Sequence, residues 1–282
     1  MICGCDNAIS VKYVNKKNQR SIWVIRKSIE DEEKWALKKE ELEKKIRKNK
    51  SKPCMNDIAK VKSLSIWVFI IPFVAVNICL FITTKLHFLI DHPYRLLNTF
   101  PYLDGGTSIS RTARYFPTYL IFKPAMFFTS YLLIKYWLYN KKIIKFFDEN
   151  HKHIKRFVFF GIASAVMLTL HSIFLGISFD IGIYKLFRRV VMLLFIIFEV
   201  VAQTYLVLTL YSIKDKLLKY INPNILKCKI FLVSILIIVA IVSIPIVTMP
   251  GNKFLKHALE WDYFVCVIGF YLLTFFMWKN KN

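Results

Sequence analysis

Six apolar stretches separated by polar segments constrain this chain more than any other feature of its sequence. Each is about twenty residues long, which is enough for a helix rising ~1.5 Å per residue to cross the ~30 Å hydrocarbon core of a bilayer. A helix satisfies its backbone hydrogen bonds internally, as that core requires. The sequence therefore predicts an all-α polytopic membrane protein with a bundle of six transmembrane helices. The stretches are Ser65–Thr84, Pro117–Tyr139, Phe157–Ser178, Val190–Tyr211, Ile230–Met249 and Asp262–Trp278.

The positive charge of the chain alternates with these stretches. The formal net charge is +23, and Lys and Arg crowd the N-terminal arm, Lys141–Arg156, Lys214–Lys229 and the tail after Trp278. By the positive-inside rule, this alternation predicts that both termini are cytoplasmic. A charge distributed over alternate loops in this way favours contact with anionic membrane lipid and argues against nucleic acid as a partner.

The first 62 residues differ in composition from the rest, so we expect two domains, a basic cytoplasmic arm at 1–62 and a transmembrane domain at 63–282. Ser28 is followed by acidic residues suited to the start of a helix, and Glu and Lys pairs then lie three or four residues apart. This pattern predicts a short charged, amphipathic helix ending near Pro53. It is either a solvated helix or, over residues 28–50, a docking surface for a cytoplasmic protein or the membrane surface.

Glu199 lies near the centre of the fourth apolar stretch, where an ionised carboxylate costs several kcal/mol unless it is compensated. Gln203 follows one helical turn later and shares its face. Asn77, Lys123 and His171 lie about 10 Å below the outer surface when the rise per residue is counted along each helix. With Glu260 at the outer start of the last stretch, the buried polar groups are predicted to gather in the outer half of the bundle.

Three interpretations of these polar groups remain open. They are hydrogen-bonded packing elements, or the wall of an outward-opening pocket for a headgroup or substrate, or part of a path for protons or ions. If the pocket belongs to an enzyme that acts on a lipid, His171 and Glu199 are the candidates for proton transfer, and Lys123 or Arg111 holds an anionic headgroup. Lys123 has its own alternative, because a lysine at this depth is able to extend to the outer interface.

The longest outer connection, between the first two stretches, contains a Pro-Tyr and an Asp-Gly-Gly turn followed by Arg111 and Arg114. Arginine forks suit phosphate or carboxylate groups, although both residues are equally compatible with a solvated loop. The candidate ligand-binding residues are therefore Asn77, Arg111, Arg114, Lys123, Gln203 and Glu260.

Two segments give the chain a resemblance to a known family. The run Pro101-Tyr102-Leu103-Asp104-Gly105-Gly106-Thr107 and the pair Glu260-Trp261 resemble the first outer loop and the start of the last span in the damage-regulated autophagy modulators (DRAM) and the FRAG-type GPI-anchor lipid-remodelling factors. The likeness covers about Ser65 to Trp278 and leaves out the N-terminal arm. It implies six spans and a role on or near membrane lipid, such as GPI-lipid remodelling or autophagy-type regulation, with no catalytic residues to transfer.

The sequence contains no phosphate-binding loop, dinucleotide fingerprint, zinc-protease motif or nucleophile elbow. His151 and His153 lie in a basic loop without further ligands, so no metal site or cofactor is expected. These observations favour a non-enzymatic, lipid-linked membrane factor. The alternatives are an intramembrane lipid-modifying enzyme that uses His171 and Glu199, and a small-solute transporter.

Overall fold

The computed structural model describes residues 8–15, 18–25, 30–86, 88, 99–177, 182–248 and 251–279. The chain divides into two compact units, Met1–Pro53 and Cys54–Asn282. The sequence analysis placed this boundary at Lys62, further along the same helix.

The first unit begins with a β-hairpin. Strands β1 (Ala8–Asn15) and β2 (Asn18–Ile25) pair antiparallel, with Ala8 opposite Ile25. Both strands are rich in β-branched and aromatic residues, which favour extended backbone. The sequence analysis noted only the polarity of this segment and did not anticipate the hairpin.

Helix α1 (Glu30–Lys85) is continuous across Pro53, where the sequence analysis expected a helix to end. That expectation is wrong for a physical reason. A proline removes one backbone hydrogen bond but keeps a helical φ angle, so it ends a helix only where the next turns lack support. Here the next turns are packed, because Ile58, Val61 and Val68 are buried.

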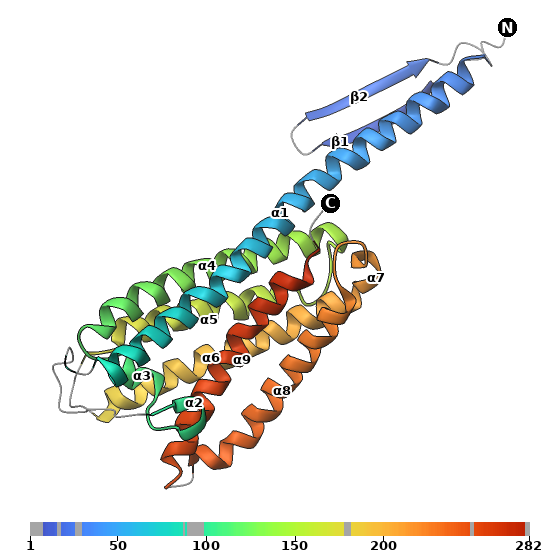
Figure 1. The fold of residues 1–282 in the computed structure, drawn as a ribbon. Coiled ribbons are helices and arrows are strands. Elements are labelled where there is room, and N and C mark those ends of the chain that lie inside the picture. The colour runs from blue at the N-terminus through green and yellow to red at the C-terminus, as the bar shows by residue number, and fades with distance from the viewer. Residues whose placement is uncertain are drawn as a thin grey trace. The chain divides into compact units, whose positions relative to one another are not determined.

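The second unit is a bundle of long helices that run side by side with the later part of α1 (Figure 1). These helices are α4 (Thr118–Phe147), α5 (Ile154–Phe174), α6 (Gly182–Ser212), α8 (Pro223–Thr248) and α9 (Lys253–Met277). The short helices α2 (Pro101–Asp104) and α3 (Ile109–Thr112) lie at one end, and α7 (Lys214–Leu217) lies at the other with the C-terminus. We call these the α2 end and the α7 end.

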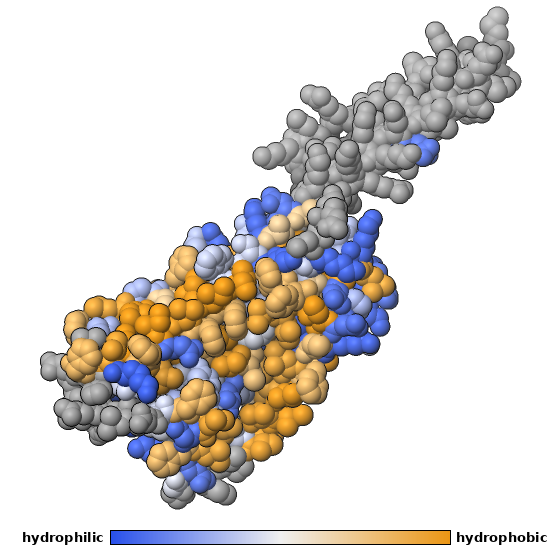
Figure 2. Space-filling view, viewed as in Figure 1, coloured by the Kyte–Doolittle hydropathy of each residue, from blue (hydrophilic) through white to orange (hydrophobic). Residues whose placement is uncertain are grey.

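Five helical segments of this unit are long and apolar enough to cross a membrane. Figure 2 shows an apolar band along the helices and hydrophilic residues at the α7 end. The protein is thus an all-α, multi-pass integral membrane protein. The remaining long helix of the bundle, α4, carries Lys123 and Lys135 within its apolar part, so a sixth crossing stays a prediction. The five segments are Met55–Lys85, Ile154–Phe174, Gly182–Ser212, Pro223–Ser243 and Lys253–Met277.

Aromatic side chains fill the bundle interior between α4, α5 and α9. Trp137 is fully buried, and its ring centroid lies 6.2 Å from that of Phe157. Gly161 on α5 faces the same indole, and a Cβ atom added there would lie 2.4 Å from Trp137 Cδ2. A glycine is therefore required for the close approach of α5 to α4. Gly269 on α9 is also helical, but no atom lies within 4 Å of the position of its Cβ.

This difference predicts opposite effects for the same substitution. We expect Gly161→Ala to destabilise the bundle by about 1–3 kcal/mol through overpacking. Gly269→Ala should be neutral, or stabilising by about 0.5–1 kcal/mol, because alanine favours a helix over glycine. Thermal melts of both purified variants in the same detergent test this. Equal melting temperatures for the two would contradict the described packing of α5 on α4.

Candidate functional site

The loop before α4 is fixed to the start of α9 at the α2 end. Trp261 Nε1 donates a hydrogen bond to the Thr107 carbonyl at 2.8 Å, and the Trp261 ring meets the Tyr102 ring with centroids 4.9 Å apart. Gly105 has φ +60°, and a Cβ there would lie 1.8 Å from the Phe254 carbonyl oxygen. These contacts position α3, which brings Arg111 to the site.

Asn77 supports this loop from α1. Its Nδ2 donates to the Phe73 carbonyl at 2.8 Å, and its Oδ1 accepts a hydrogen bond from the Tyr102 hydroxyl at 3.1 Å. Burial raises the pKa of Tyr102, which therefore donates as a neutral phenol at ordinary pH. Asn77 was predicted as a ligand-binding residue, but the structure places it behind the loop.

Glu199 is fully buried and accepts three hydrogen bonds from three helices. Ser164 Oγ of α5 donates to Oε2 at 2.6 Å, Gln203 Nε2 of α6 donates to Oε1 at 3.1 Å, and the Tyr271 hydroxyl of α9 also donates to Oε1. Gln203 Nε2 donates further to the Val267 carbonyl at 3.1 Å. Gln203 was one of the partners considered from the sequence. Ser164 and Tyr271 were not anticipated.

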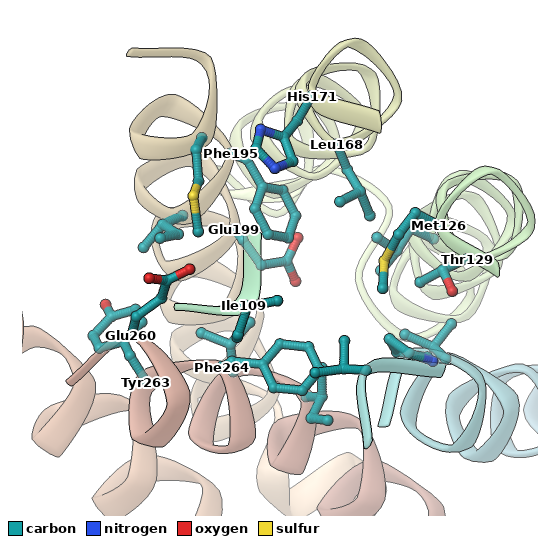
Figure 3. A pocket seen from close by; sticks show the side chains of 18 of the residues that line it. Ile109, Met126, Thr129, Leu168, His171, Phe195, Glu199, Glu260, Tyr263 and Phe264 are labelled. Carbon is teal, nitrogen blue, oxygen red and sulfur yellow. The ribbon is translucent and has the colours of Figure 1, made fainter. Parts of the chain in front are cut away.

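An apolar cavity of about 100 Å³ lies beside this carboxylate, between α1, α4, α5, α6 and α9. Figure 3 shows Glu199, His171 and Glu260 pointing toward it from three different helices. Most of the remaining wall is hydrocarbon or aromatic. The apolar lining includes Val68, Val76, Ile109, Phe122, Met126, Leu133, Leu168, Phe195, Ile196, Phe264, Val267 and Ile268.

A second, larger cavity of about 560 Å³ lies at the α2 end and is strongly basic. Four guanidinium groups line it, from Arg111, Arg114, Arg188 and Arg189, together with the imidazole of His257. Glu260 is the single carboxylate among the described residues of its wall. The basic cavity and the apolar cavity adjoin, because both are lined by Ser110, His171, Met192 and Glu260.

Several polar atoms that line these cavities are buried without a hydrogen-bond partner among the described residues. They are Arg114 Nε, Arg188 Nε, His171 Nδ1 and Glu260 Oε1. The carboxylate of Glu260 also lies against the backbone N–H groups of Ile109 and Ser110. Buried polar atoms are normally paired, so these four are available for the polar groups of a ligand.

Lys123 lies outside both cavities. Its Nζ donates to the Ile173 carbonyl at 3.4 Å and lies 5.8 Å from the centroid of the Tyr119 ring. This placement agrees with the alternative interpretation of Lys123 as a side chain that extends to the interface. The other candidate residues except Asn77 lie at or beside the two cavities. Arg111, Arg114, His171 and Glu260 line the basic cavity, Glu199 lines the apolar cavity, and Gln203 supports Glu199 from behind.

A buried lysine near the α7 end was not predicted from the sequence. Lys229 on α8 is fully buried, and its Nζ donates to Thr274 Oγ1 at 2.7 Å and lies 3.8 Å from the centroid of the Phe270 ring. The Tyr136 hydroxyl shares the same Thr274 oxygen at 3.1 Å. The sequence analysis assigned Lys229 to a basic loop, but Pro223 already marks the start of a helix there.

No match to a known protein accompanies this geometry. The chain matches no protein-family model, no curated protein and no solved structure. In the part of the chain that the structure describes, no three His, Cys, Asp or Glu side chains are grouped to hold a metal ion. The two adjoining cavities therefore define the candidate site by their own chemistry.

The hydrogen bonds of Glu199 predict how it responds to substitution. Glu199→Leu removes the acceptor of the buried Tyr271 hydroxyl, whereas Ser164 and Gln203 each keep a backbone carbonyl as a second acceptor. We therefore expect a loss of about 1–3 kcal/mol of stability. Glu199→Gln keeps an acceptor oxygen and the shape of the side chain, and should melt close to the wild type. Melting temperatures of the two purified variants in one detergent test this. Equal destabilisation by Gln and Leu would contradict a role based on hydrogen bonding.

Proposed function

We propose that this protein is a lipid-linked membrane factor that binds an anionic membrane amphiphile at the α2 end. The observation that supports this most strongly is the adjacency of the two cavities through four common wall residues. An amphiphile has the same division, with a charged headgroup next to a hydrocarbon chain. The basic cavity takes the headgroup, and the apolar cavity takes part of a chain.

The energetics of both halves favour such a ligand. The apolar wall has few polar groups to desolvate, so a lipid chain passes from the bilayer into the cavity at little cost. A guanidinium group binds a phosphate or a carboxylate through two parallel hydrogen bonds. Hydrogen bonds between charged groups are stronger than those between neutral groups. A non-enzymatic role in organising or regulating lipid needs no more than this binding.

We further propose membership of the family that contains the DRAM proteins and the FRAG-type factors. The two segments that carry the resemblance are in contact with each other in this structure. Tyr102 packs on Trp261, and the Trp261 indole donates to the Thr107 carbonyl. A resemblance based on two distant segments gains support when both build one feature of the fold.

An intramembrane lipid-modifying enzyme is the second candidate, and one observation favours it. His171 Nδ1 and Glu260 Oε1 are buried without partners, and both residues line the two cavities where these adjoin. A general acid or base must reach the reacting group, and these two atoms are free to do so. Both oxygens of Glu199 are already occupied, so Glu260 replaces Glu199 as the partner of His171. Turnover of a bound lipid during incubation in nanodiscs would favour this candidate over binding alone.

We propose that all six long helices cross the membrane and that the α7 end is cytoplasmic. The charge alternation of the sequence supports this orientation. Cations at that end also lie over aromatic rings, as is typical of a membrane interface. Lys142 Nζ is 4.9 Å from the centroid of the Tyr139 ring, and Lys214 Nζ is 4.7 Å from that of Tyr211.

Labelling of single introduced cysteines tests the orientation. Lys145 lies near the end of α4 at the α7 end, and Lys253 begins α9 at the α2 end; both side chains are exposed. In intact cells a membrane-impermeant maleimide should label Lys253→Cys and spare Lys145→Cys, in a background without the native cysteines. Permeabilised cells should give labelling of both. Labelling of Lys145→Cys in intact cells would contradict the proposed topology.

Lipid binding is tested with the purified protein and a matched pair of variants. Native mass spectrometry in detergent should find an anionic lipid bound to the wild type. Arg114→Gln removes a cation from the basic cavity, so occupancy should fall by about tenfold, the effect of losing ~1.4 kcal/mol. Lys123→Gln removes a cation outside both cavities and should leave occupancy unchanged.

The apolar cavity is tested separately by filling it. The Leu168 side chain points into the cavity, and Leu168→Trp should displace part of a bound chain (Figure 3). If both Leu168→Trp and Arg114→Gln keep wild-type occupancy while the proteins remain folded, the proposed lipid site is wrong.

A further inference from the structure

The positive charge of the basic cavity favours anionic headgroups of high negative charge. Its described wall residues contribute four guanidinium groups and one carboxylate. Arg188 is close enough to Arg114 and Arg189 to experience their charges. Like charges brought together in one cavity are stabilised by an anion of matching charge. A phosphate monoester carries about −1.5 to −2 at neutral pH, whereas a phosphodiester has a single ionised oxygen.

The hydrogen-bonding capacity of the arginines points the same way. Arg114 follows α3 and Arg188 belongs to α6, so two separate elements present guanidinium groups to one cavity. The Nε of each is buried without a partner among the described residues. Each guanidinium engages phosphate oxygens through a planar fork of donors. The phosphate of a monoester offers three unsubstituted oxygens to the two guanidinium groups. The phosphate of a diester offers only two.

Glu260 adds a requirement at the boundary of the two cavities. It lines both, and its Oε1 is buried without a partner. A ligand with its phosphate in the basic cavity and its chain in the apolar one therefore passes this oxygen. A carboxylate oxygen needs a hydrogen-bond donor there, and a hydroxyl or amine next to the phosphate-bearing carbon supplies one.

We propose, on the basis of the proposed function, that the ligand is an amphiphile whose headgroup is a phosphate monoester with an adjacent hydrogen-bond donor. Arg114 and Arg188 hold the phosphate, and Glu260 accepts from the donor. The apolar cavity, at about 100 Å³, has room for part of a single chain. Lipids whose phosphate bears a second substituent, such as glycerol or choline, bind more weakly.

A series of lipids with one chain and different headgroups tests this. The full-length protein in phosphatidylcholine nanodiscs is titrated with 1-oleoyl lysophosphatidic acid, 1-oleoyl lysophosphatidylglycerol, 1-oleoyl lysophosphatidylcholine and oleyl phosphate, and binding is measured by native mass spectrometry. We expect the monoester lysophosphatidic acid to bind at least about tenfold more tightly than the diester lysophosphatidylglycerol. Oleyl phosphate, which lacks the hydroxyl, should fall between them.

Two variants assign the preference to residues. Arg188→Gln should reduce the difference between monoester and diester to about threefold or less, while Lys123→Gln should preserve it. Glu260→Ala should abolish the advantage of lysophosphatidic acid over oleyl phosphate. Arg114→Gln, which removes the other guanidinium assigned to the phosphate, replaces Arg188→Gln if the latter does not give a folded protein in a thermal melt.

The outcomes separate this inference from the proposed function. Equal affinity for monoester and diester overturns the inference and leaves an anionic lipid site in place. Failure to bind any of the four lipids overturns both. If inorganic phosphate at equal concentration competes fully with lysophosphatidic acid, the site holds free phosphate, and the inference of an amphiphile is overturned.

Discussion

The pairing of Glu199 is the interaction on which the rest of the bundle depends. A carboxylate at this depth is tolerated because Ser164, Gln203 and Tyr271 each donate to it. Two of these donors come from α5 and α9, so the three helices are held in one relative rotation. That rotation turns His171 and Glu260 toward a common space and separates the apolar cavity from the basic one. The site is therefore a consequence of satisfying the hydrogen bonds of one buried carboxyl group.

Helix α9 connects the features of the bundle from one end to the other. One of its faces presents Glu260 and Phe264 to the cavities, Tyr271 to Glu199, and Thr274 to Lys229. Successive residues of this set are four, seven and three positions apart, which places them on a single helical face. A ligand that contacts Glu260 therefore acts on the same helix whose other end holds the buried lysine. In this way helix α9 links the residues beside a ligand at the α2 end to the residues packed at the α7 end.

The helices were predictable from the sequence, but the site was predictable only in part. Apolar stretches locate spans because they are contiguous, whereas the wall of a cavity depends on helix rotation, which spacing alone does not fix. Asn77 and Lys123 were placed at the depth of His171, yet they face a loop and the interface. Arg188 and Arg189 carried a usable signal, since two adjacent cations in a segment predicted to be outer oppose the charge rule. The hairpin and the continuation of α1 beyond Pro53 depend on pairing and packing that the composition of the arm did not reveal.

The central claim is that a lipid chain enters the apolar cavity beside Glu199. Photo-crosslinking with a single-chain phosphate amphiphile that carries a diazirine within the first few carbons of its chain, followed by peptide mapping, measures this directly. The account predicts labels on α5 near Leu168 and on α9 near Phe264, which line the cavity. It also predicts their loss when unlabelled ligand is in excess. Labels confined to outward-facing side chains such as Phe159 and Phe231, which are 66% and 67% exposed, would contradict it.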